Sequence, residues 1–479
     1  MHGQNCPGSL GLFRYKPSEA GTLKLVALAG RRFLQSRAGY AIRVVQRLQD
    51  SSGRAFLALI DQALFSSSSL VINALLARVL SPEDYGAFAV AFLIYLFCAG
   101  FHNAMLLEPM SVLGSSSYAD RLHCYIRAQL RFHVHITTGL GLLLACAAGV
   151  LFLFPADKSL SRVLMAVAIT LPILLLFWVA RRFHYVEQNP AAAALSSGLY
   201  TGTAVGCVVA LHAFGHLTSV TAFAALAAAA MVGSVRFLVG VRRETAQYAA
   251  IATYEVVRTN WNYGRWLLTS ALLYPVSVQI QVFVAAGSLG LGAAGVLRAV
   301  QLPSIAMTQA IAAIGTLELP ALSFAFGSGD LPLVRRRATQ VTGTLVLLAL
   351  AYEAVLILAN HRIERLLYDG KFSDNAWLMA SFGIAPVFSA YLTGRGTALR
   401  AIRKPQFDLA MNLITAPFGL ASAFAFVHWW GISGAVASNL ATAALSAMVL
   451  AYFYRNALQI SSLAVVASGH GSPILAERS

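Results

Sequence analysis

Residues 55–114, AFLALIDQALFSSSSLVINALLARVLSPEDYGAFAVAFLIYLFCAGFHNAMLLEPMSVLG, decide the fold. They predict two membrane-spanning helices, because each half holds about the 20 mostly apolar residues that cross a hydrocarbon core. A short polar turn, Ser81-Pro82-Glu83-Asp84, joins the two helices, and the second is expected to end at Leu107-Glu108-Pro109. The stretch is therefore typical of a protein embedded in a bilayer.

The first of these helices carries a polar face that a simple anchor does not need. Gln62, Ser66, Ser69 and Asn73 stand at i, i+4, i+7 and i+11 and share one side of the helix, with Asp61 beside them. Lipid cannot satisfy hydrogen-bonding groups, so this face must meet a protein interior or a water-filled cavity. The four residues of the stripe are therefore predicted to line a substrate cavity.

The whole chain has the composition of a polytopic membrane protein. Of its 479 residues, 58% are hydrophobic and only 11% are charged, and the mean hydropathy is +0.68. A soluble domain carries about a quarter charged residues. The net charge of +16 does not indicate a nucleic-acid partner, because the basic residues collect in loops. The five cysteines have neither paired nor metal-ligand spacing, so no metal site is expected.

Apolar windows recur along the chain and predict an all-α protein with about twelve spans. The windows are 55–79, 86–108, 133–156, 160–181, 190–214, 217–239, 264–286, 290–320, 340–360, 374–394, 406–429 and 431–454. The eighth is long enough to be tilted, or broken near Pro303. The loops between windows are short, so no extramembrane domain is expected to carry a soluble active site.

Charge in the loops predicts the orientation of the chain. Alternate loops are rich in arginine, including Arg127, Arg181, Arg182, Arg337 and Arg395. By the positive-inside rule these loops face the cytoplasm, and so do both termini, which agrees with an even number of spans. We therefore expect a multi-pass membrane protein with both termini in the cytoplasm.

The two halves of the chain resemble each other. Leu107-Glu108 lies 210 positions before Leu317-Glu318, and Arg181 lies 214 positions before Arg395. The repeat predicts two pseudo-symmetric six-helix lobes around a central cavity, related by an axis along the membrane normal. The expected parts are a basic cytoplasmic N-terminal segment at 1–54, an N-lobe at 55–239, a cytoplasmic linker at 240–263, a C-lobe at 264–455 and a cytoplasmic tail at 456–479. The basic segment has the pattern either of an interfacial helix or of a solvated tail.

At the first helix the chain resembles a known family. Ile60-Asp61-Gln62-Ala63-Leu64-Phe65, Leu75-Leu76-Ala77-Arg78 and Asp84-Tyr85-Gly86 look like the opening of polysaccharide exporters of the multidrug/oligosaccharidyl-lipid/polysaccharide (MOP) superfamily. The resemblance covers roughly residues 55–455. It implies a protein of the bacterial inner membrane that flips undecaprenyl-diphosphate-linked oligosaccharide from the cytoplasmic to the periplasmic leaflet, as in Wzx-type O-antigen flippases. Many polysaccharide members have fourteen helices, whereas twelve is the number of the multidrug branch, so the subfamily stays open.

Arg298 is the main candidate for binding an anionic headgroup. It lies in the eighth predicted span, with Gln301 and Gln309 on its face. A charge within the membrane costs about 2.5–3.5 kcal/mol even on lenient scales, so it needs a role or a partner. Arg298 would hold a phosphate, and the two glutamines would bond sugar hydroxyls. The alternative is that Arg298 snorkels to the membrane surface or pairs with a carboxylate at a helix end.

Acidic residues in or near the spans are candidates for H⁺ or Na⁺ coupling, and no cofactor is expected. Asp61, Glu353 and Asp408 lie in or beside apolar windows, where a carboxylate binds a cation readily. Helix capping is the alternative for Asp61 and Asp408. A further set is predicted to end helices at the cytoplasmic face and form a gate, with glutamates paired to loop arginines: Glu108, Glu318, Arg127 and Arg337.

Three functions follow from these patterns. The favoured one is a flippase for lipid-linked oligosaccharide, working by alternating access in cell-surface polysaccharide biosynthesis, with a glycan polymerase and export machinery as partners. The runner-up is a cation-coupled multidrug or small-molecule exporter of the same fold. A membrane enzyme is disfavoured, because neither a sizeable loop nor a His/Asp constellation is evident. The glycan itself, whether O-antigen, capsule or exopolysaccharide, is not specified by these residues.

Overall fold

The computed structural model describes residues 53, 56–114, 117–154, 158–243, 251–402, 404 and 406–467. Almost all of the predicted basic segment 1–54 and the end of the predicted tail, after 467, lie outside these ranges. The fold described below is that of the unit Ala58–Ser479.

The first half of the chain forms six spans. They are the first helix Phe56–Val79, then α2 Pro82–His102 with a π-helix Asn103–Leu107 and α3 Glu108–Gly114, then α4 Leu122–Phe152, α5 Lys158–Val186, α6 Pro190–Ala213 and α7 Ser219–Arg243. A 3₁₀ turn, Ala119–Arg121, precedes α4. The helices extend past several predicted windows, because polar residues continue them beyond the apolar core.

The second half repeats this arrangement. It comprises α8 Thr253–Leu289, α9 Leu291–Gly327, α10 Leu331–Tyr368, a 3₁₀ turn Ser373–Asn375, α11 Ala376–Ala401 and α12 Gln406–Ala467. Helix α9 runs through Pro303 without a break. The predicted linker 240–263 is partly helical, since α7 ends at Arg243 and α8 begins at Thr253. The lobe boundaries stay predictions.

Helix α12 is two spans joined by a sharp reversal. Gly431 has φ 59° and ψ −133°, a conformation that only glycine adopts easily. Past this point the chain doubles back, and the hydroxyl oxygens of Ser422 and Ser438 lie 2.8 Å apart. Eleven helices in the described residues are long and apolar enough to span a membrane. Counting α12 twice gives twelve, as the sequence predicted, in a nearly all-helical fold without strands in the described ranges.

Short polar residues followed by proline begin several of these helices. The side chain of Ser81 accepts the backbone N–H of Asp84 at 3.1 Å, with Pro82 as the first helical residue. Asn189 caps α6 in the same way before Pro190, and Asp330 caps α10. Such caps satisfy N–H groups that have no partner inside the helix. The local sequence thus determines where these three spans begin.

The second span does not stop at Leu107-Glu108-Pro109, contrary to the prediction. The α-helix changes to a π-helix at Asn103–Leu107 and continues as α3 to Gly114. Proline lacks an N–H and clashes with the carbonyl four residues earlier. The extra residue of the π-turn gives Pro109 room, so the helix passes the proline. Glu318 likewise lies inside α9 and does not end it.

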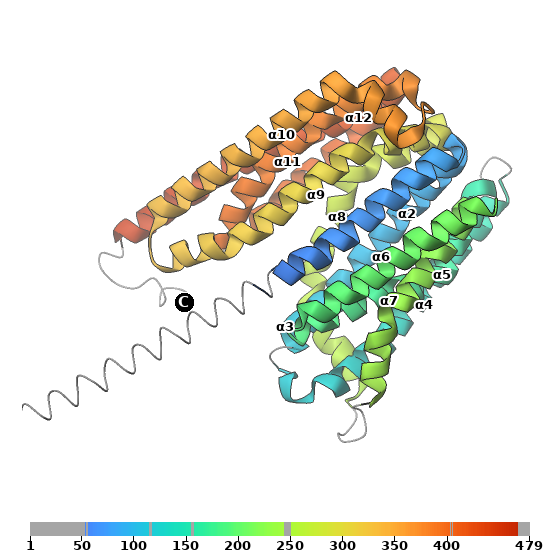
Figure 1. The fold of residues 1–479 in the computed structure, drawn as a ribbon. Coiled ribbons are helices and arrows are strands. Elements are labelled where there is room, and N and C mark those ends of the chain that lie inside the picture. The colour runs from blue at the N-terminus through green and yellow to red at the C-terminus, as the bar shows by residue number, and fades with distance from the viewer. Residues whose placement is uncertain are drawn as a thin grey trace, which may run out of the picture. The chain divides into compact units, whose positions relative to one another are not determined.

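The two halves pack by the same scheme. In the first half α5 contacts α2, α4 and α7, and in the second half α11 contacts α9, α10 and α12 (Figure 1). Both central helices contain an internal proline, Pro172 and Pro386, which stand 214 positions apart. This offset equals the one between Arg181 and Arg395. The repeat in the sequence is therefore a repeat in the fold.

The halves meet where α2 crosses α9. A Cβ on Gly86 would overlap the Leu291 carbonyl, and a Cβ on Gly295 would overlap the Pro82 carbonyl. The contacts are reciprocal: Leu291 lies 209 positions after Pro82, and Gly295 lies 209 positions after Gly86. Two equivalent helices thus touch backbone to backbone through their glycines, as small residues permit. We call this contact the glycine crossing.

Candidate functional site

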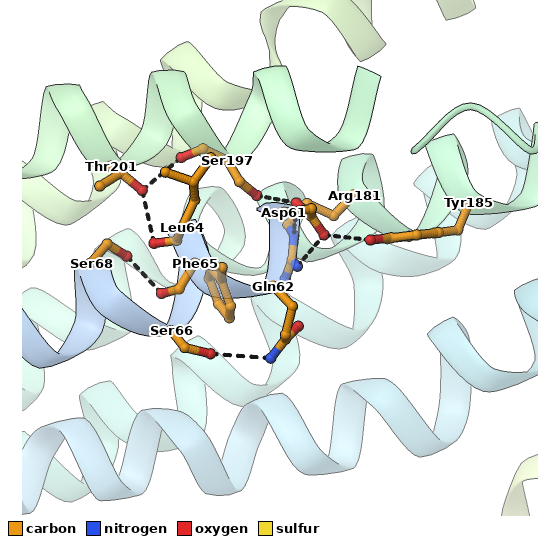
Figure 2. A network of polar contacts seen from close by, with 10 residues as sticks. All are labelled: Asp61, Gln62, Leu64, Phe65, Ser66, Ser68, Arg181, Tyr185, Ser197 and Thr201. Carbon is orange, nitrogen blue, oxygen red and sulfur yellow. Dashed lines mark hydrogen bonds and ion pairs between the residues drawn. The ribbon is translucent and has the colours of Figure 1, made fainter. Parts of the chain in front are cut away.

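Asp61 lies at the centre of a buried polar network. Its Oδ1 accepts hydrogen bonds from Arg181 Nε at 3.2 Å and from the Ser197 hydroxyl at 2.5 Å. Its Oδ2 accepts from Arg181 Nη2 and from the Tyr185 hydroxyl, both at 2.6 Å. Figure 2 shows these three side chains converging on the carboxylate from α5 and α6. The Asp61 side chain is fully buried.

These four hydrogen bonds occupy the carboxylate. A carboxylate has about four lone-pair sites, so Asp61 can bind an added ion only by releasing a present partner. Arg181 also lies over the Phe65 ring, with its Cζ 4.2 Å from the ring centroid, which fixes the guanidinium further. The role of Asp61 in ion coupling stays a prediction.

Arg181 is the partner that sequence reasoning missed. The sequence placed it in a basic cytoplasmic loop, but it lies inside α5, and its side chain is only 12% exposed. A buried carboxylate requires a compensating cation, and Arg181 and Tyr185 stand one helical turn apart on one face. That spacing is the signal in the sequence that could have identified Arg181 as the partner.

The polar stripe of the first helix lies on the side away from this network. In Figure 2, Gln62 and Ser66 point away from Ser197 and Thr201, and the Gln62 amide donates to the Ser66 hydroxyl at 3.1 Å. Gln62 is exposed, and Ser66 and Ser69 are partly buried. Asn73 is buried, with its Oδ1 lacking a partner among the described residues.

Arg298 is a buried cation that forms no ion pair with any residue of the described ranges. It is 4% exposed, and its Nε and Nη1 have no hydrogen-bond partner in the described part of the chain. Its surroundings include the hydroxyls of Tyr85 and Tyr368, which interact with it electrostatically. Gln301 is also buried, with an unsatisfied Oε1, whereas Gln309 is exposed. Of the three polar residues predicted to share one face of α9, Arg298 and Gln301 are therefore buried, whereas Gln309 is not.

A second set of contacts joins the lobes beside the glycine crossing. Lys371, in the turn after α10, donates to the carbonyls of Ala77, Arg78 and Leu80 at 3.2, 2.5 and 2.7 Å. It thus caps the end of the first helix, where unpaired carbonyls favour a cation. Arg78 donates to the Leu366 carbonyl at 3.2 Å and lies 3.8 Å from Asp369. We call these contacts, together with the glycine crossing, the closed end.

The predicted gate residues are arranged differently in the two lobes. Arg337 Nε lies 3.0 Å from Glu318 Oε2, as the proposed pairing requires. Glu108, however, lies 3.7 Å from Arg182 and not against Arg127, because the π-turn rotates it toward α5. The Glu108–Arg182 pair lies within the N-lobe and the Glu318–Arg337 pair within the C-lobe, so neither pair joins the two lobes. A gating role stays a prediction.

The two remaining carboxylates differ in their surroundings. Asp408 lies in the first turn of α12, is partly exposed and stands 4.0 Å from Arg400 Nε, as expected of a helix-start carboxylate. Glu353 is 7% exposed near the middle of α10, with an unpartnered Oε2. The described residues contain no group of three or more His, Cys, Asp or Glu that could hold a metal.

No family model matches this sequence, and no curated protein matches it. Solved structures do match. An inward-facing multidrug-resistance MATE transporter of the MOP superfamily shares 14% identity and a TM-score of 0.70, over 85% of this chain and 99% of the other. An outward-facing one shares 15% identity and a TM-score of 0.62, over 85% and 95% of the two chains.

The chain has the fold of the MATE transporters. A MOP superfamily transporter from Pyrococcus furiosus Vc1, described as having a binding pocket of reversed polarity, also matches. It shares 14% identity and a TM-score of 0.57, over 85% of this chain and 95% of its own. The MOP fold predicted from the first helix is confirmed. The eleven long apolar helices in the described residues fit a multi-pass membrane protein.

Proposed function

We propose that this protein flips a lipid-linked oligosaccharide, carried on undecaprenyl diphosphate, across the bacterial inner membrane. The two lobes would alternate between openings to the two sides, with both termini in the cytoplasm. The resemblance of the first helix to polysaccharide exporters supports this substrate class. A glycan polymerase and the export machinery would then act on the product.

The single observation that carries the proposal is the sign of the uncompensated charge. Asp61 is neutralised by Arg181, whereas Arg298 has two buried nitrogens without partners. An unpaired buried cation is costly, and an anion that reaches it removes that cost. A diphosphate is such an anion, and guanidinium binds its oxygens through paired hydrogen bonds. The charge around Arg298 therefore favours an anionic substrate over a cationic drug.

The closed end bears on the state of the transporter. The first helix and α10 both finish here, and the predicted topology assigns this end to the extracytoplasmic side. We take this state to be open toward the cytoplasm, where lipid-linked glycans are assembled. The substrate would enter between the lobes, and separation of the closed end would expose Arg298.

A second candidate is a cation-coupled exporter of drugs or other small molecules. The observation in its favour is that the matching structures include multidrug-resistance MATE transporters. Accumulation in a strain lacking the gene separates the two. Lipid-linked repeat units held on the cytoplasmic leaflet support the flippase, whereas unchanged glycan with altered drug tolerance supports the exporter.

The first prediction concerns Arg298 in this assay. Arg298→Ala should abolish glycan export while the protein still inserts, because the headgroup loses its cation. Arg298→Lys keeps the charge and should retain partial export, since lysine cannot form the paired contact. If the alanine variant, present in the membrane in equal amount, exports glycan at the wild-type level, Arg298 does not bind the substrate.

A further inference from the structure

A groove runs between α4 and α5 on the surface of the first half. It has a volume of about 210 Å³ and is open to the outside. Leu142, Ala145 and Ile169 are among the residues that line it. The hydroxyl of Thr137, which is also in the lining, donates to the His133 carbonyl at 2.8 Å and so is already satisfied. The lining of the groove is therefore mainly apolar.

The groove is present because α5 has a small side chain where α11 has a large one. At the offset of 214 that relates Pro172 to Pro386, Ala168 corresponds to Phe382, which is buried in the second half. On the α4 side Gly141 lets the helices approach, since a Cβ there would lie 2.9 Å from the Ala168 carbonyl oxygen. The second half thus fills a position that the first half leaves open.

The groove lies on the side of α4 that turns away from the second half. On the opposite, buried side of α4, the Asn260 amide of α8 donates to Gln129 Oε1 at 3.0 Å. Leu142, Leu143 and Ile169, in or beside the groove, are all exposed. Exposed leucine and isoleucine in a membrane span face lipid, and water has few hydrogen-bond partners in such a groove. The groove therefore opens to the hydrocarbon of the bilayer.

Basic residues follow the same side of α4 up to the groove. Arg127, Arg131 and His135, which we call the basic stripe, fall with Thr138 and Leu142 within one arc of about 80° on the helix. His135 Nδ1 donates to the Arg131 carbonyl at 2.6 Å. Neither arginine side chain forms a hydrogen bond or an ion pair within the described ranges. The predicted topology assigns this end of α4 to the cytoplasmic side.

The spacing between the basic stripe and the groove matches the dimensions of a phospholipid. Arg131 and Leu142 are 11 positions apart, which corresponds to about 16 Å along a helix. One leaflet contributes about 15 Å to the hydrocarbon core. A phosphate at the level of Arg131 would therefore place its acyl chain along the groove. Two arginines without a carboxylate partner favour a net anionic headgroup over one that carries its own cation.

We propose that the groove and the basic stripe bind an anionic phospholipid of the cytoplasmic leaflet. The phosphate lies against Arg127 and Arg131, and one acyl chain fills the groove. The chain occupies the space beside Ala168 that Phe382 fills in the second half, and so stabilises the packing of α4 on α5. This site is separate from Arg298 and does not depend on what the protein transports.

Native mass spectrometry of the purified full chain tests the headgroup. Phosphatidylglycerol should bind more tightly than phosphatidylcholine with the same acyl chains. Replacing both Arg127 and Arg131 by Gln should weaken phosphatidylglycerol binding about 30-fold, since each basic residue near an anionic surface contributes about fivefold. The matched control removes two exposed arginines from the first turns of α10, by Arg335→Gln and Arg336→Gln, and should leave binding unchanged. Equal binding of the two lipids, or equal losses in the two double variants, overturns the proposal.

Two variants test the position of the acyl chain with the basic stripe intact. Ala145→Phe should fill the groove and weaken phosphatidylglycerol binding. Leu142→Ala, at an exposed position that folding tolerates, should also weaken it by removing one wall of the groove. Leu347→Ala, at an exposed leucine of α10, is the control and should not. Unchanged binding in Leu142→Ala, competition by inorganic phosphate as effective as by the lipid, or a lipid-free dimer formed through this face would each overturn the proposal.

Discussion

At the scale of single residues, the buried charged side chains of the spans differ in whether they have a partner of opposite charge. Asp61 is paired with Arg181 and two hydroxyls, so its burial is compensated. Arg298 and Glu353 are buried with unsatisfied polar atoms, in separate parts of the second half. A compensated pair stabilises one arrangement, whereas uncompensated groups are available to a ligand or a proton. On this distinction we propose that Asp61 mainly stabilises the packing of the first helix against α5 and α6, and that Arg298 is available to a substrate.

The pair makes a direct prediction about stability. Arg181→Ala leaves Asp61 as a buried unpaired charge and should lower the free energy of unfolding by about 3–5 kcal/mol. Thermal or denaturant unfolding of the purified protein measures this loss. The double variant Arg181→Ala, Asp61→Asn should recover part of it.

The neighbouring arginine provides the matched control. Arg182 contacts Asn103 and lies 3.7 Å from Glu108 with both charged side chains about a third exposed. Arg182→Ala should therefore cost less than about 1 kcal/mol. Equal losses of unfolding free energy in Arg181→Ala and Arg182→Ala would show that the burial of Asp61 does not make its ion pair more stabilising than the exposed one.

At the scale of secondary-structure elements, glycine decides how the lobes meet. Gly86 and Gly295 let α2 and α9 touch backbone to backbone at the closed end. Gly100, also in α2, makes no such close contact, since a Cβ there would lie 3.6 Å from the nearest atom, the Ala271 carbonyl oxygen. A backbone carbonyl in a helix cannot move aside as a flexible side chain can. The closed state therefore depends on residue size at two symmetric positions.

Alanine at these positions should shift the balance between states. Gly86→Ala should separate the lobes at the closed end, because the new methyl overlaps the Leu291 carbonyl. Cysteines placed at Arg78 and Asp369 report the separation through a lower yield of cross-linking. Gly100→Ala should leave the yield unchanged. An unaltered yield in Gly86→Ala would mean that the crossing does not hold the lobes together.

At the scale of the whole molecule, the proposed transport cycle requires the two lobes to part where they now touch. The closed end combines the glycine crossing with Lys371 on the last carbonyls of the first helix and with Arg78 near Asp369. The polar contacts among them join residues that lie nearly three hundred positions apart in the chain. Any opening of this end would have to break all of them together.

Locking this end should stop the cycle. In a chain with cysteines at Arg78 and Asp369, cross-linking should abolish glycan export in cells, and reduction should restore it. A cross-linker that joins two cysteines within one lobe, at Glu318 and Arg337, should have a smaller effect, because that pair does not bridge the lobes. Continued export with the closed end locked would contradict alternating access by lobe separation.

The amino-acid sequence by itself determined the class, the twelve spans, the polar face of the first helix and the repeat. Each depends on local periodicity, on apolar length or on a constant offset, because lipid rejects unpaired polar groups wherever they stand in the chain. Tertiary packing alone decided the partner of Asp61, since Arg181 lies 120 positions away. It also decided the π-turn that carries the second span past Pro109, the closed end and the groove between α4 and α5. These depend on which backbone atoms come within a few ångströms, and only the packed helices fix such distances.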